Sequence, residues 1–495
     1  MPGLTPLRGT NGVTLGPDGR LWVAQFLAGR IAAVDPATGD VEVIVAPDGP
    51  IQAPDDLAFG TDGSLYVADL VPGRVWRRSP GGEFQLVTDE VRLPNGITCV
   101  GDRLFVNEMI PGGRLLELFT DGRPPVVLTG SLAMGNAMQA GPDGRLYYPH
   151  MITGEVWRIP VDGGDPELVA EGLPEPVAVR FDRAGALLVL SRDAAGTVTR
   201  LDGARRSLVT TGIVGMDNAT FDDENRMFVS SYAGGGITEV RPDGRTREVV
   251  PGGLNGPHGV TVDLAGAVHA ADHYGIAGPD AFALHTFAHG IAASAGLFHL
   301  TSQYGQVKTF DPGSGSARLR AAGLDRPTGL SVRPDGALVI AEAGAGRVLV
   351  IDADDAVGVL AEGLGRPVDV ALDSDGRCYV SDEERGSVYR IDAGVPVEVA
   401  SGLSAPQGLA ISGDELFVVE TGNGRVLAIA LDGSSTRIVA EGLAVGASGR
   451  TEEPVLTAHG LPGVPRPFAG LAAGPGGTLH LAADGLVLQL PVGIS

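Results

Sequence analysis

The chain has 495 residues, too many for one ordinary domain and enough for about two or three. It carries 60 acidic side chains against 36 basic ones, a formal net charge of −24. A surface of that sign repels phosphate backbones and anionic lipid, so we expect no nucleic-acid and no membrane partner. Neither a secretory leader nor a membrane-spanning apolar run is visible, which predicts a cytoplasmic protein with Cys99 and Cys378 reduced.

The first elements of the chain are short strands separated by turns. An alternating run at 12–15 is followed by a Gly-Pro-Asp-Gly turn at 16–19, and further alternating runs follow at 20–24, 29–35 and 41–45. Proline presets the backbone angle of such a turn, and glycine adopts the angle that other residues avoid. The pattern predicts a meander of four antiparallel strands, and no helical periodicity of useful length follows it.

The same unit recurs along the whole chain, mostly at steps of 39 to 41 residues. Twelve copies begin at Asn11, Asp55, Asn95, Asn136, Val177, Asp217, His258, His289, Thr328, Val368, Gln407 and Ala469. One such meander leaves its faces exposed, whereas radial stacking buries them. We therefore predict an all-β fold of two six-bladed β-propellers at 8–253 and 254–495, the second with an insertion at 441–466. A split into seven and five blades is the alternative, and the way each ring closes is left open.

A propeller brings the start of each first strand and the end of each second strand to one mouth. In the first ring these positions hold mostly Asn, Asp, Gln and Glu, and in the second they include Asp272, Glu342 and Glu420. Carboxylate and amide oxygens suit hard cations such as Mg²⁺ or Ca²⁺. For any single residue the structural interpretation is favoured, because Asn and Asp cap turns and an acid can pair with a neighbouring arginine.

The second ring adds imidazoles to this mouth. His258 opens its first blade, Asp272 ends the second strand of that blade, and His289 opens the next blade. An imidazole beside carboxylates can act as general acid or base near neutral pH. His269 falls in mid-strand and is interpreted as structural, and the role of His273 is left open. The segment that leaves blade seven and the insertion at 441–466 form either a lid over this mouth or a loop between domains.

The repeat unit, P-x-G-(V/I/L)-x-x-x-P-D-G-x-L-(W/Y)-V-A-(D/E), resembles that of the SMP-30/gluconolactonase-like, NHL-repeat and streptogramin B lyase propellers. The gluconolactonase-like resemblance implies a divalent metal held by Asn95 in "LPNGI" and Asp217 in "GMDNAT". Asp55 is a weaker match, and Asn11 stands where that branch has a glutamate. The lyase resemblance implies that His258 in "PHG" is a base, and Asp272 falls near the position where that branch has a metal-binding acid after the second strand. Gly256 stands where that branch has another acid.

We therefore expect a small-molecule enzyme with its site at the second mouth. His258 is the expected acid/base and His289 the expected assistant, while Asp272, Glu342 and Glu420 hold or orient a divalent metal, Mg²⁺ or Ca²⁺. The expected reaction is proton abstraction and elimination, as in a lyase or cyclase, on an organic ester, lactone or polyketide-like metabolite. The alternatives are a metal-dependent lactonase at Asn95 and Asp217 and a non-catalytic propeller that binds a ligand or a protein.

Overall fold

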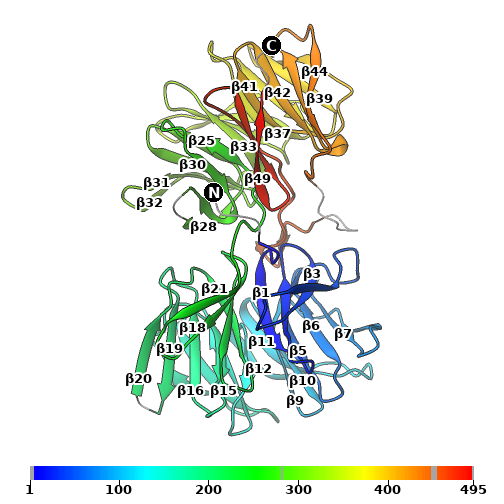
Figure 1. Ribbon diagram of the computed structural model, residues 1–495, viewed down its shortest axis with the longest axis vertical. Helices are drawn as coiled ribbons and strands as arrows, with labels where there is room; N and C mark the ends of the chain where they lie inside the picture. Colours follow the sequence, from blue (N-terminus) through cyan, green and yellow to red (C-terminus); the bar gives the residue numbers. More distant parts are fainter. Residues whose placement is uncertain (1–4, 204, 280–281, 447–453, 493–495) are drawn as a thin grey trace. The chain divides into compact units, whose positions relative to one another are not determined.

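The computed structural model describes residues 5–203, 205–279, 282–446 and 454–492. The chain divides into two compact units (Figure 1). The N-terminal unit comprises Thr5–Asn255 and Gly449–Val464, and the C-terminal unit comprises Gly256–Ser448 and Pro465–Ser495. The boundary between residues 255 and 256 lies close to the expected one, but part of the insertion assigned to the second propeller belongs to the N-terminal unit. Among the described residues no helix is long and apolar enough to cross a membrane.

The N-terminal unit is built from four-stranded antiparallel sheets in which strands consecutive in sequence are neighbours. A short separate hairpin, β45 (Thr457–Ala458) with β46 (Leu461–Pro462), joins it from the insertion. The sheets are β1 (Thr10–Leu15), β2 (Leu21–Gln25), β3 (Arg30–Val34), β4 (Val41–Val45); β5 (Pro54–Phe59), β6 (Leu65–Asp69), β7 (Arg74–Arg78), β8 (Phe84–Thr88); β9 (Pro94–Val100), β10 (Arg103–Glu108), β11 (Pro111–Leu118), β12 (Val126–Ala133); β13 (Gln139–Ala140), β14 (Arg145–His150), β15 (Glu155–Pro160), β16 (Glu167–Ala170); β17 (Pro176–Phe181), β18 (Leu187–Ser191), β19 (Thr197–Asp202), β20 (Arg205–Thr210); and β21 (Met216–Phe221), β22 (Met227–Ser231), β23 (Ile237–Val240), β24 (Thr246–Val250).

The first strands of these sheets are neighbours around a closed ring. Strand β1 contacts β5, the contacts continue through β9, β13 and β17 to β21, and β21 contacts β1 again. Apolar side chains fill the space between the first and last sheets, where Val13 and Leu21 belong to one cluster with Phe228 and Ile237. Sheets that pack face to face around an axis bury surfaces that each would expose alone. The N-terminal unit is therefore a β-propeller.

The C-terminal unit repeats this architecture. Its first strands run in contact from β25 through β29, β33, β37 and β41 to β47, which contacts β25, and the last sheet has three strands within the described residues. Its elements are β25 (Val260–Val262), β26 (Val268–Ala271), β27 (His273–Ala277), β28 (Phe282–Ala288); β29 (Ile291–Ser294), β30 (Leu297–Ser302), β31 (Gln306–Asp311), β32 (Ser316–Ala321); β33 (Pro327–Val332), β34 (Leu338–Glu342), β35 (Arg347–Ile351), β36 (Val357–Ala361); β37 (Pro367–Leu372), β38 (Cys378–Asp382), β39 (Ser387–Asp392), β40 (Val395–Ala400); β41 (Pro406–Ser412), β42 (Glu415–Glu420), the 3₁₀ turn η1 (Thr421–Asn423), β43 (Arg425–Ala430), β44 (Thr436–Glu441); and β47 (Leu471–Gly474), β48 (Thr478–Ala483), β49 (Leu486–Pro491).

The register of the first two strands changes at the mouth of each ring. Pro54 pairs with Asp69, and the next paired residues are Leu57 and Val67, so the first strand holds one residue more than its partner over this interval. The same shift separates Pro327 from Leu330 opposite β34. An additional residue bends the strand and redirects its side chains. The residues at the strand starts are therefore free of regular pairing and available to the mouth.

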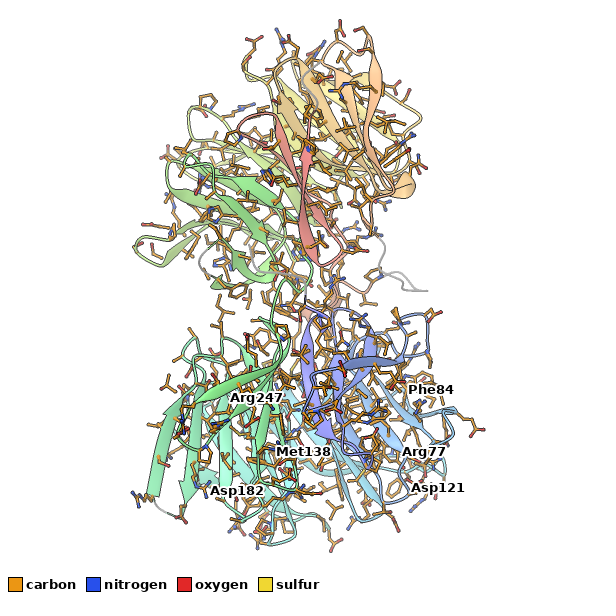
Figure 2. All side chains as sticks on the ribbon, viewed as in Figure 1. Arg77, Phe84, Asp121, Met138, Asp182 and Arg247 are labelled. Carbon is orange, nitrogen blue, oxygen red and sulfur yellow. The ribbon has the colours of Figure 1, made fainter. Side chains whose placement is uncertain are left out.

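Charged side chains concentrate on the outer strands and loops. Figure 2 shows Arg77 and Asp121 at the periphery of the N-terminal unit. The Arg77 guanidinium lies 2.7 Å from the Asp62 carboxylate, and Asp121 pairs with Arg123 at 2.9 Å. Such exposed pairs contribute about 0–1 kcal/mol each. The exposed ion pairs of the rim therefore add little to the stability of the propeller.

Where a second strand ends in an acid, as β6 and β38 do, this side chain ties its own blade together. The Asp69 carboxylate accepts hydrogen bonds from the backbone N–H groups of Gln52 (3.1 Å) and Ala53 (2.7 Å), which precede the first strand of the same sheet. Asp382 accepts equivalent bonds from Gly365 and Arg366. The structural interpretation of this position therefore holds in both rings: the side chain satisfies loop donors that would otherwise be buried without a partner.

Replacing Asp69 with asparagine is expected to remove a pH dependence of stability. Burial raises the pKa of Asp69 to about 6, whereas an aspartate in the unfolded chain titrates near 4. The folded form therefore binds the proton more tightly, and stability falls as pH rises from about 4 through about 6, by about 3 kcal/mol at most. In urea titrations, the free energy of unfolding of Asp69→Asn relative to that of the wild type should be higher at pH 7 than at pH 4. An equal difference at both pH values would contradict this assignment.

Candidate functional site

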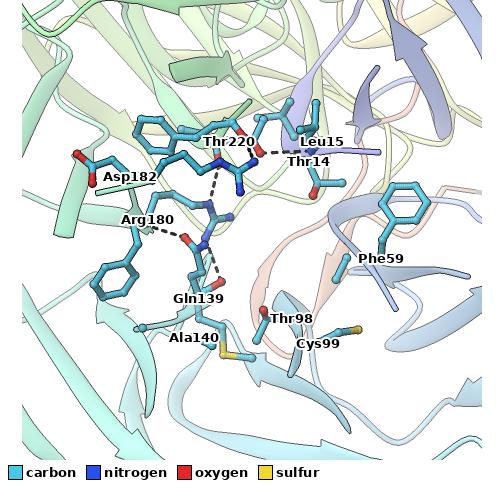
Figure 3. Close-up of a pocket in the computed structure, with 18 of the residues that line it drawn as sticks. Thr14, Leu15, Phe59, Thr98, Cys99, Gln139, Ala140, Arg180, Asp182 and Thr220 are labelled. Atoms are coloured by element: carbon cyan, nitrogen blue, oxygen red, sulfur yellow. Dashed lines mark hydrogen bonds between the residues drawn. The ribbon is translucent and has the colours of Figure 1, made fainter. Parts of the chain in front are cut away.

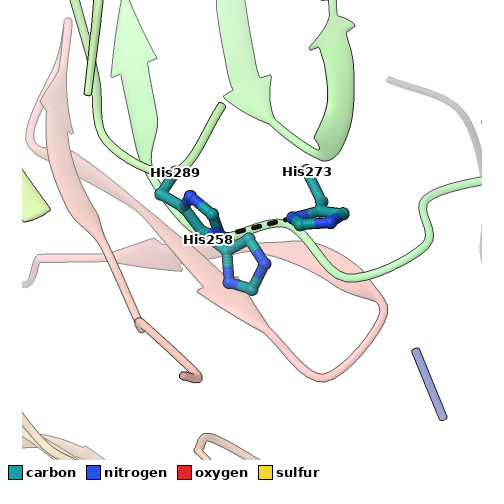
Figure 4. Close-up of side chains that lie close together, drawn as sticks. All are labelled: His258, His273 and His289. Atoms are coloured by element: carbon teal, nitrogen blue, oxygen red, sulfur yellow. Dashed lines mark hydrogen bonds between the residues drawn. The ribbon is translucent and has the colours of Figure 1, made fainter. Parts of the chain in front are cut away.

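Three histidines meet at the mouth of the C-terminal unit. His258 precedes β25, His273 is the first residue of β27, and His289 lies between β28 and β29. One ligand atom of each lies within 4.8 Å of the others. The His273 Nδ1 and His289 Nε2 atoms are 3.3 Å apart, and the rings of His258 and His289 have centroids 4.8 Å apart (Figure 4). The structure thus brings together the expected pair, His258 and His289, and adds His273.

A strained turn places His273 in the cluster. Its φ angle is +55°, the left-handed region that side chains other than glycine and asparagine rarely adopt. The Asp272 N–H donates to the Gly275 carbonyl at 2.8 Å across this turn. Gly275 has no room for a side chain, because a Cβ there would lie 2.6 Å from the Ala283 carbonyl oxygen. The short connection between β26 and β27 therefore forces the imidazole toward His289, at a backbone cost on the order of 1–3 kcal/mol.

Close approach of the strand starts fixes the other two histidines. The Gly259 N–H donates to the His289 carbonyl at 2.6 Å, and a Cβ on Gly259 would lie 2.6 Å from the same oxygen. The His258 N–H in turn donates to the Ala271 carbonyl at 2.8 Å. Glycine after each histidine thus lets neighbouring first strands touch through their backbones. This close approach explains why glycine follows histidine in the "PHG" and "HG" segments of the sequence.

Burial keeps two of the imidazoles uncharged. His273 is 1% exposed and His289 is 0% exposed. Burial first, and then the neighbouring imidazoles, lower the pKa of both rings well below the usual value. Neutral rings at pH 7 carry a lone pair that can accept a proton or bind a metal. The His273 and His289 rings therefore present nitrogen lone pairs and no charge.

Aromatic rings enclose the cluster on one side. The His273 ring has centroid distances of 4.5 Å to Tyr274, 5.5 Å to Phe287 and 6.4 Å to Tyr304. Tyr304 also lies 5.8 Å from the His289 ring. Edge-to-face contacts of this kind hold imidazoles in fixed orientations and exclude water from their faces. Nothing in the sequence marked these aromatic residues, because Phe287 and Tyr304 follow irregular blade connections.

The carboxylates expected to bind a metal beside the histidines have other partners. Asp272 Oδ1 accepts a hydrogen bond from Gly256 N at 2.9 Å. Glu342 accepts from the backbone N–H of Asp325 at 2.7 Å and pairs with Arg347. Glu420 likewise accepts from the Ser404 N–H at 2.7 Å and pairs with Arg425.

These contacts give the three acids the blade-tying role described for Asp69. When a carboxylate already pairs with an arginine and accepts a backbone N–H bond, its negative charge is largely neutralised and it binds a cation weakly. Within the described residues the compact group of metal-binding atoms consists of the histidines and excludes Glu342 and Glu420. Their role as ligands stays a prediction that this geometry does not support.

The N-terminal unit has a second polar cluster at its mouth, made of oxygens. The Asn11 Nδ2 donates to Asp55 Oδ2 at 3.0 Å. Three further buried oxygens, Asn11 Oδ1, Asp55 Oδ1 and Asn95 Oδ1, have no hydrogen-bond partner within the part of the chain that the structure describes. Burial, and next the charge of Asp217, raise the pKa of Asp55 well above its usual value. Burial also raises the pKa of Asp217 to about 7. The expected oxygen positions are therefore buried and incompletely satisfied.

An apolar segment of the insertion packs at this N-terminal mouth. Val464 belongs to a cluster with Phe26, Leu70 and Ile110, residues that follow the second strands, and Leu461 of β46 packs against it. The described part of the insertion, 454–464, thus covers the oxygen cluster's side of the N-terminal ring. Whether the insertion is a lid over His258 or a loop between domains stays a prediction, and 447–453 lie outside the described part.

The far end of the N-terminal channel holds a cavity of about 690 Å³ (Figure 3). Arg180 closes it toward the oxygen cluster: its guanidinium donates to the carbonyls of Ala219 (2.7 Å) and Met138 (3.0 Å) and to Asn218. Arg180 is 9% exposed. The only sequence signal for it is an arginine inside the alternating first strand "VAVRF", and the sequence analysis missed it.

Comparisons with known proteins add a likeness of fold only. Neither a protein-family model nor a curated protein matches the chain. A streptogramin B lyase structure is 20% identical, with 54% of this chain and 92% of that chain covered and a TM-score of 0.41. A structural-genomics target assigned provisionally as a gluconolactonase is 16% identical, with coverages of 50% and 91% and a TM-score of 0.41. A structure of a nidogen/laminin complex is 19% identical, with 45% of this chain and 88% of that chain covered and a TM-score of 0.40.

Proposed function

We propose that the chain is an enzyme that cleaves an ester or lactone of a small organic molecule at the mouth of its C-terminal propeller. The observation that carries the proposal is the meeting of His258, His273 and His289 within 4.8 Å. A propeller needs no buried histidine for its own stability, and two of these three rings are fully buried. Such a group at a channel mouth, with lowered pKa values, is typical of a reactive site.

The favoured reaction is elimination. A neutral imidazole accepts the proton from a carbon beside a carbonyl group, as expected for His258. The C–O bond on the next carbon breaks, its electron pair leaves with the departing carboxylate, and a carbon–carbon double bond remains. A divalent cation, proposed as cofactor, would stabilise the negative charge that develops on the carbonyl oxygen. The aromatic wall of Tyr274, Phe287 and Tyr304 favours an apolar substrate such as a polyketide-like lactone.

A metal-dependent lactonase at the N-terminal mouth is the second candidate. The unsatisfied oxygens of Asn11, Asp55 and Asn95 favour it, because buried oxygens without donors are what a hard cation such as Ca²⁺ or Mg²⁺ would satisfy. Asp217, whose pKa is raised by burial, would supply the fourth ligand. Here the residues present fit an oxygen-binding ion, although Val464 and its neighbours cover the approach.

A product analysis in isotopically labelled water separates the candidates. The full-length protein is incubated with a panel of lactones and β-acyloxy esters. Elimination gives an unsaturated product without the label, whereas hydrolysis places it in the new carboxylate. We expect an unlabelled, unsaturated product that is lost in His258→Ala and retained in Asn95→Ala and Asp217→Asn.

Two outcomes would overturn this assignment. A labelled product lost only in the Asn95 and Asp217 variants would favour the lactonase. Turnover of no substrate in the panel, together with saturable ligand binding, would favour the binding propeller, which is the remaining alternative.

A further inference from the structure

We propose that His258, His273 and His289 jointly bind one zinc-class transition-metal ion, with an open coordination position toward the mouth. The inference deepens the proposed function by naming its metal, and it gives His258 the role of ligand in place of proton acceptor, because an imidazole bound to a metal has no lone pair left for a proton. It rests on the proposed function for the reaction but not for the site. It replaces the expected Mg²⁺ or Ca²⁺ bound by carboxylates at this mouth. Three imidazoles are donors that Zn²⁺, Co²⁺, Ni²⁺ and Cu²⁺ prefer, whereas Mg²⁺ and Ca²⁺ prefer oxygen.

The nitrogen separations fit a tetrahedral ion. With Zn–N distances of about 2.0–2.1 Å, two ligands of a tetrahedron lie roughly 3.3–3.4 Å apart. His273 Nδ1 and His289 Nε2 are separated by 3.3 Å. The third nitrogen completes a group with all separations within 4.8 Å, which is about 1.4 Å above the tetrahedral separation, so the His258 ring has to shift toward the other two.

The Nδ1 atom of His289 has a donor on the side of the ring away from the cluster. The Gln303 N–H donates to it at 3.3 Å. The other ring nitrogen, Nε2, therefore faces the cluster, 3.3 Å from His273 Nδ1. Binding of an ion through Nε2 requires Nδ1 to carry the ring proton, so the Gln303 contact has to lengthen.

The open position follows from the difference in burial. His273 and His289 are fully buried, whereas His258 keeps partial exposure at the mouth. Catalytic zinc sites use three protein ligands and leave the fourth position to water or substrate. A structural site would instead close all four positions with side chains. Three histidine ligands therefore leave one position of the ion for water or substrate, on the side of His258, the least buried of the three.

Cobalt titration of the full-length protein tests this inference without an activity assay. The protein is stripped with a chelator, and Co²⁺ is added while the visible absorption of tetrahedral cobalt is recorded. We expect one equivalent per chain, displaced by Zn²⁺ and not by Mg²⁺ or Ca²⁺. His258→Ala, His289→Ala and His273→Asn should each weaken binding by more than roughly 100-fold, the upper range for residues that only support a ligand.

The variants are chosen so that misfolding can be recognised. Asparagine tolerates the left-handed backbone of His273, so His273→Asn removes the imidazole and keeps the turn. His269→Ala and His299→Ala are matched controls, since these residues bond to Asp263 and to Ser294 and Thr309 outside the cluster. Both controls should bind cobalt as the wild type does, and every variant should still unfold in a cooperative urea transition without metal.

The outcomes distinguish the site from the function. Absence of a bound equivalent, or full binding in any of the three cluster variants, overturns the metal site. Chelator-resistant elimination that depends on His258 also overturns it but leaves the proposed function standing. One tightly bound equivalent without turnover of any ester or lactone supports the site and overturns the function.

Discussion

Replacing His289 with alanine is expected to lower kcat/KM for the elimination by a factor of about 10²–10⁴, the range for loss of a positioned imidazole. His289 lies in contact with both His258 and His273, so its removal disrupts whichever nitrogen reacts. Steady-state kinetics on the substrate found in the product analysis give the measurement. The effect should be on kcat more than on KM, because the ring acts at the reacting atoms.

His299→Ala is the control for this experiment. His299 lies on β30 of the next blade, 4% exposed, and bonds to Ser294 and Thr309. It should therefore cost stability and leave kcat within about twofold, as expected for a residue outside the reacting group. Equal kinetics for His289→Ala and the wild type would remove the histidine cluster from the account.

Replacing Arg180 with methionine is expected to destabilise the N-terminal unit by about 3–5 kcal/mol, the cost of breaking a buried ionic network. The change leaves the carbonyls of Ala219 and Met138 without their donor. It also removes the positive charge that lowers the pKa of buried Asp56. Urea unfolding, followed by fluorescence of tryptophans that all lie in this unit, reports the change.

Arg183→Met is the matched control for Arg180. Arg183 follows the same strand, β17, but its side chain is 51% exposed in its pair with Asp223. An exposed pair of this kind contributes about 0–1 kcal/mol. A loss for Arg180→Met as small as that of Arg183→Met would show that the channel arginine is not part of the structural network.

The repeat made the fold and half of the site predictable from the sequence. Regular turns and alternation identify the sheets, and the ring geometry follows from their need to cover each other. The same geometry placed His258 and His289 at one mouth. The strand ends hold the expected acids, Asp272, Glu342 and Glu420. The sequence does not show that loop N–H groups and arginines already bind these carboxylates.

The remaining features depend on structure that is not periodic. His273 joins the cluster through a left-handed turn in a shortened blade connection, and no repeat position corresponds to it. Residues 454–464 pack in the N-terminal unit although they are inserted between strands of the C-terminal one. Arg180 looks like any residue of an alternating strand until its carbonyl partners are known. Contacts between distant segments decide all three cases.

A crystal structure of the zinc-loaded protein, with anomalous differences recorded at the zinc absorption edge, tests the central claim most directly. We predict one strong peak about 2.0–2.1 Å from a nitrogen of each of His258, His273 and His289. Imidazoles held apart with no anomalous peak between them would contradict the account, and so would a peak found only among the oxygens of Asn11, Asp55 and Asn95.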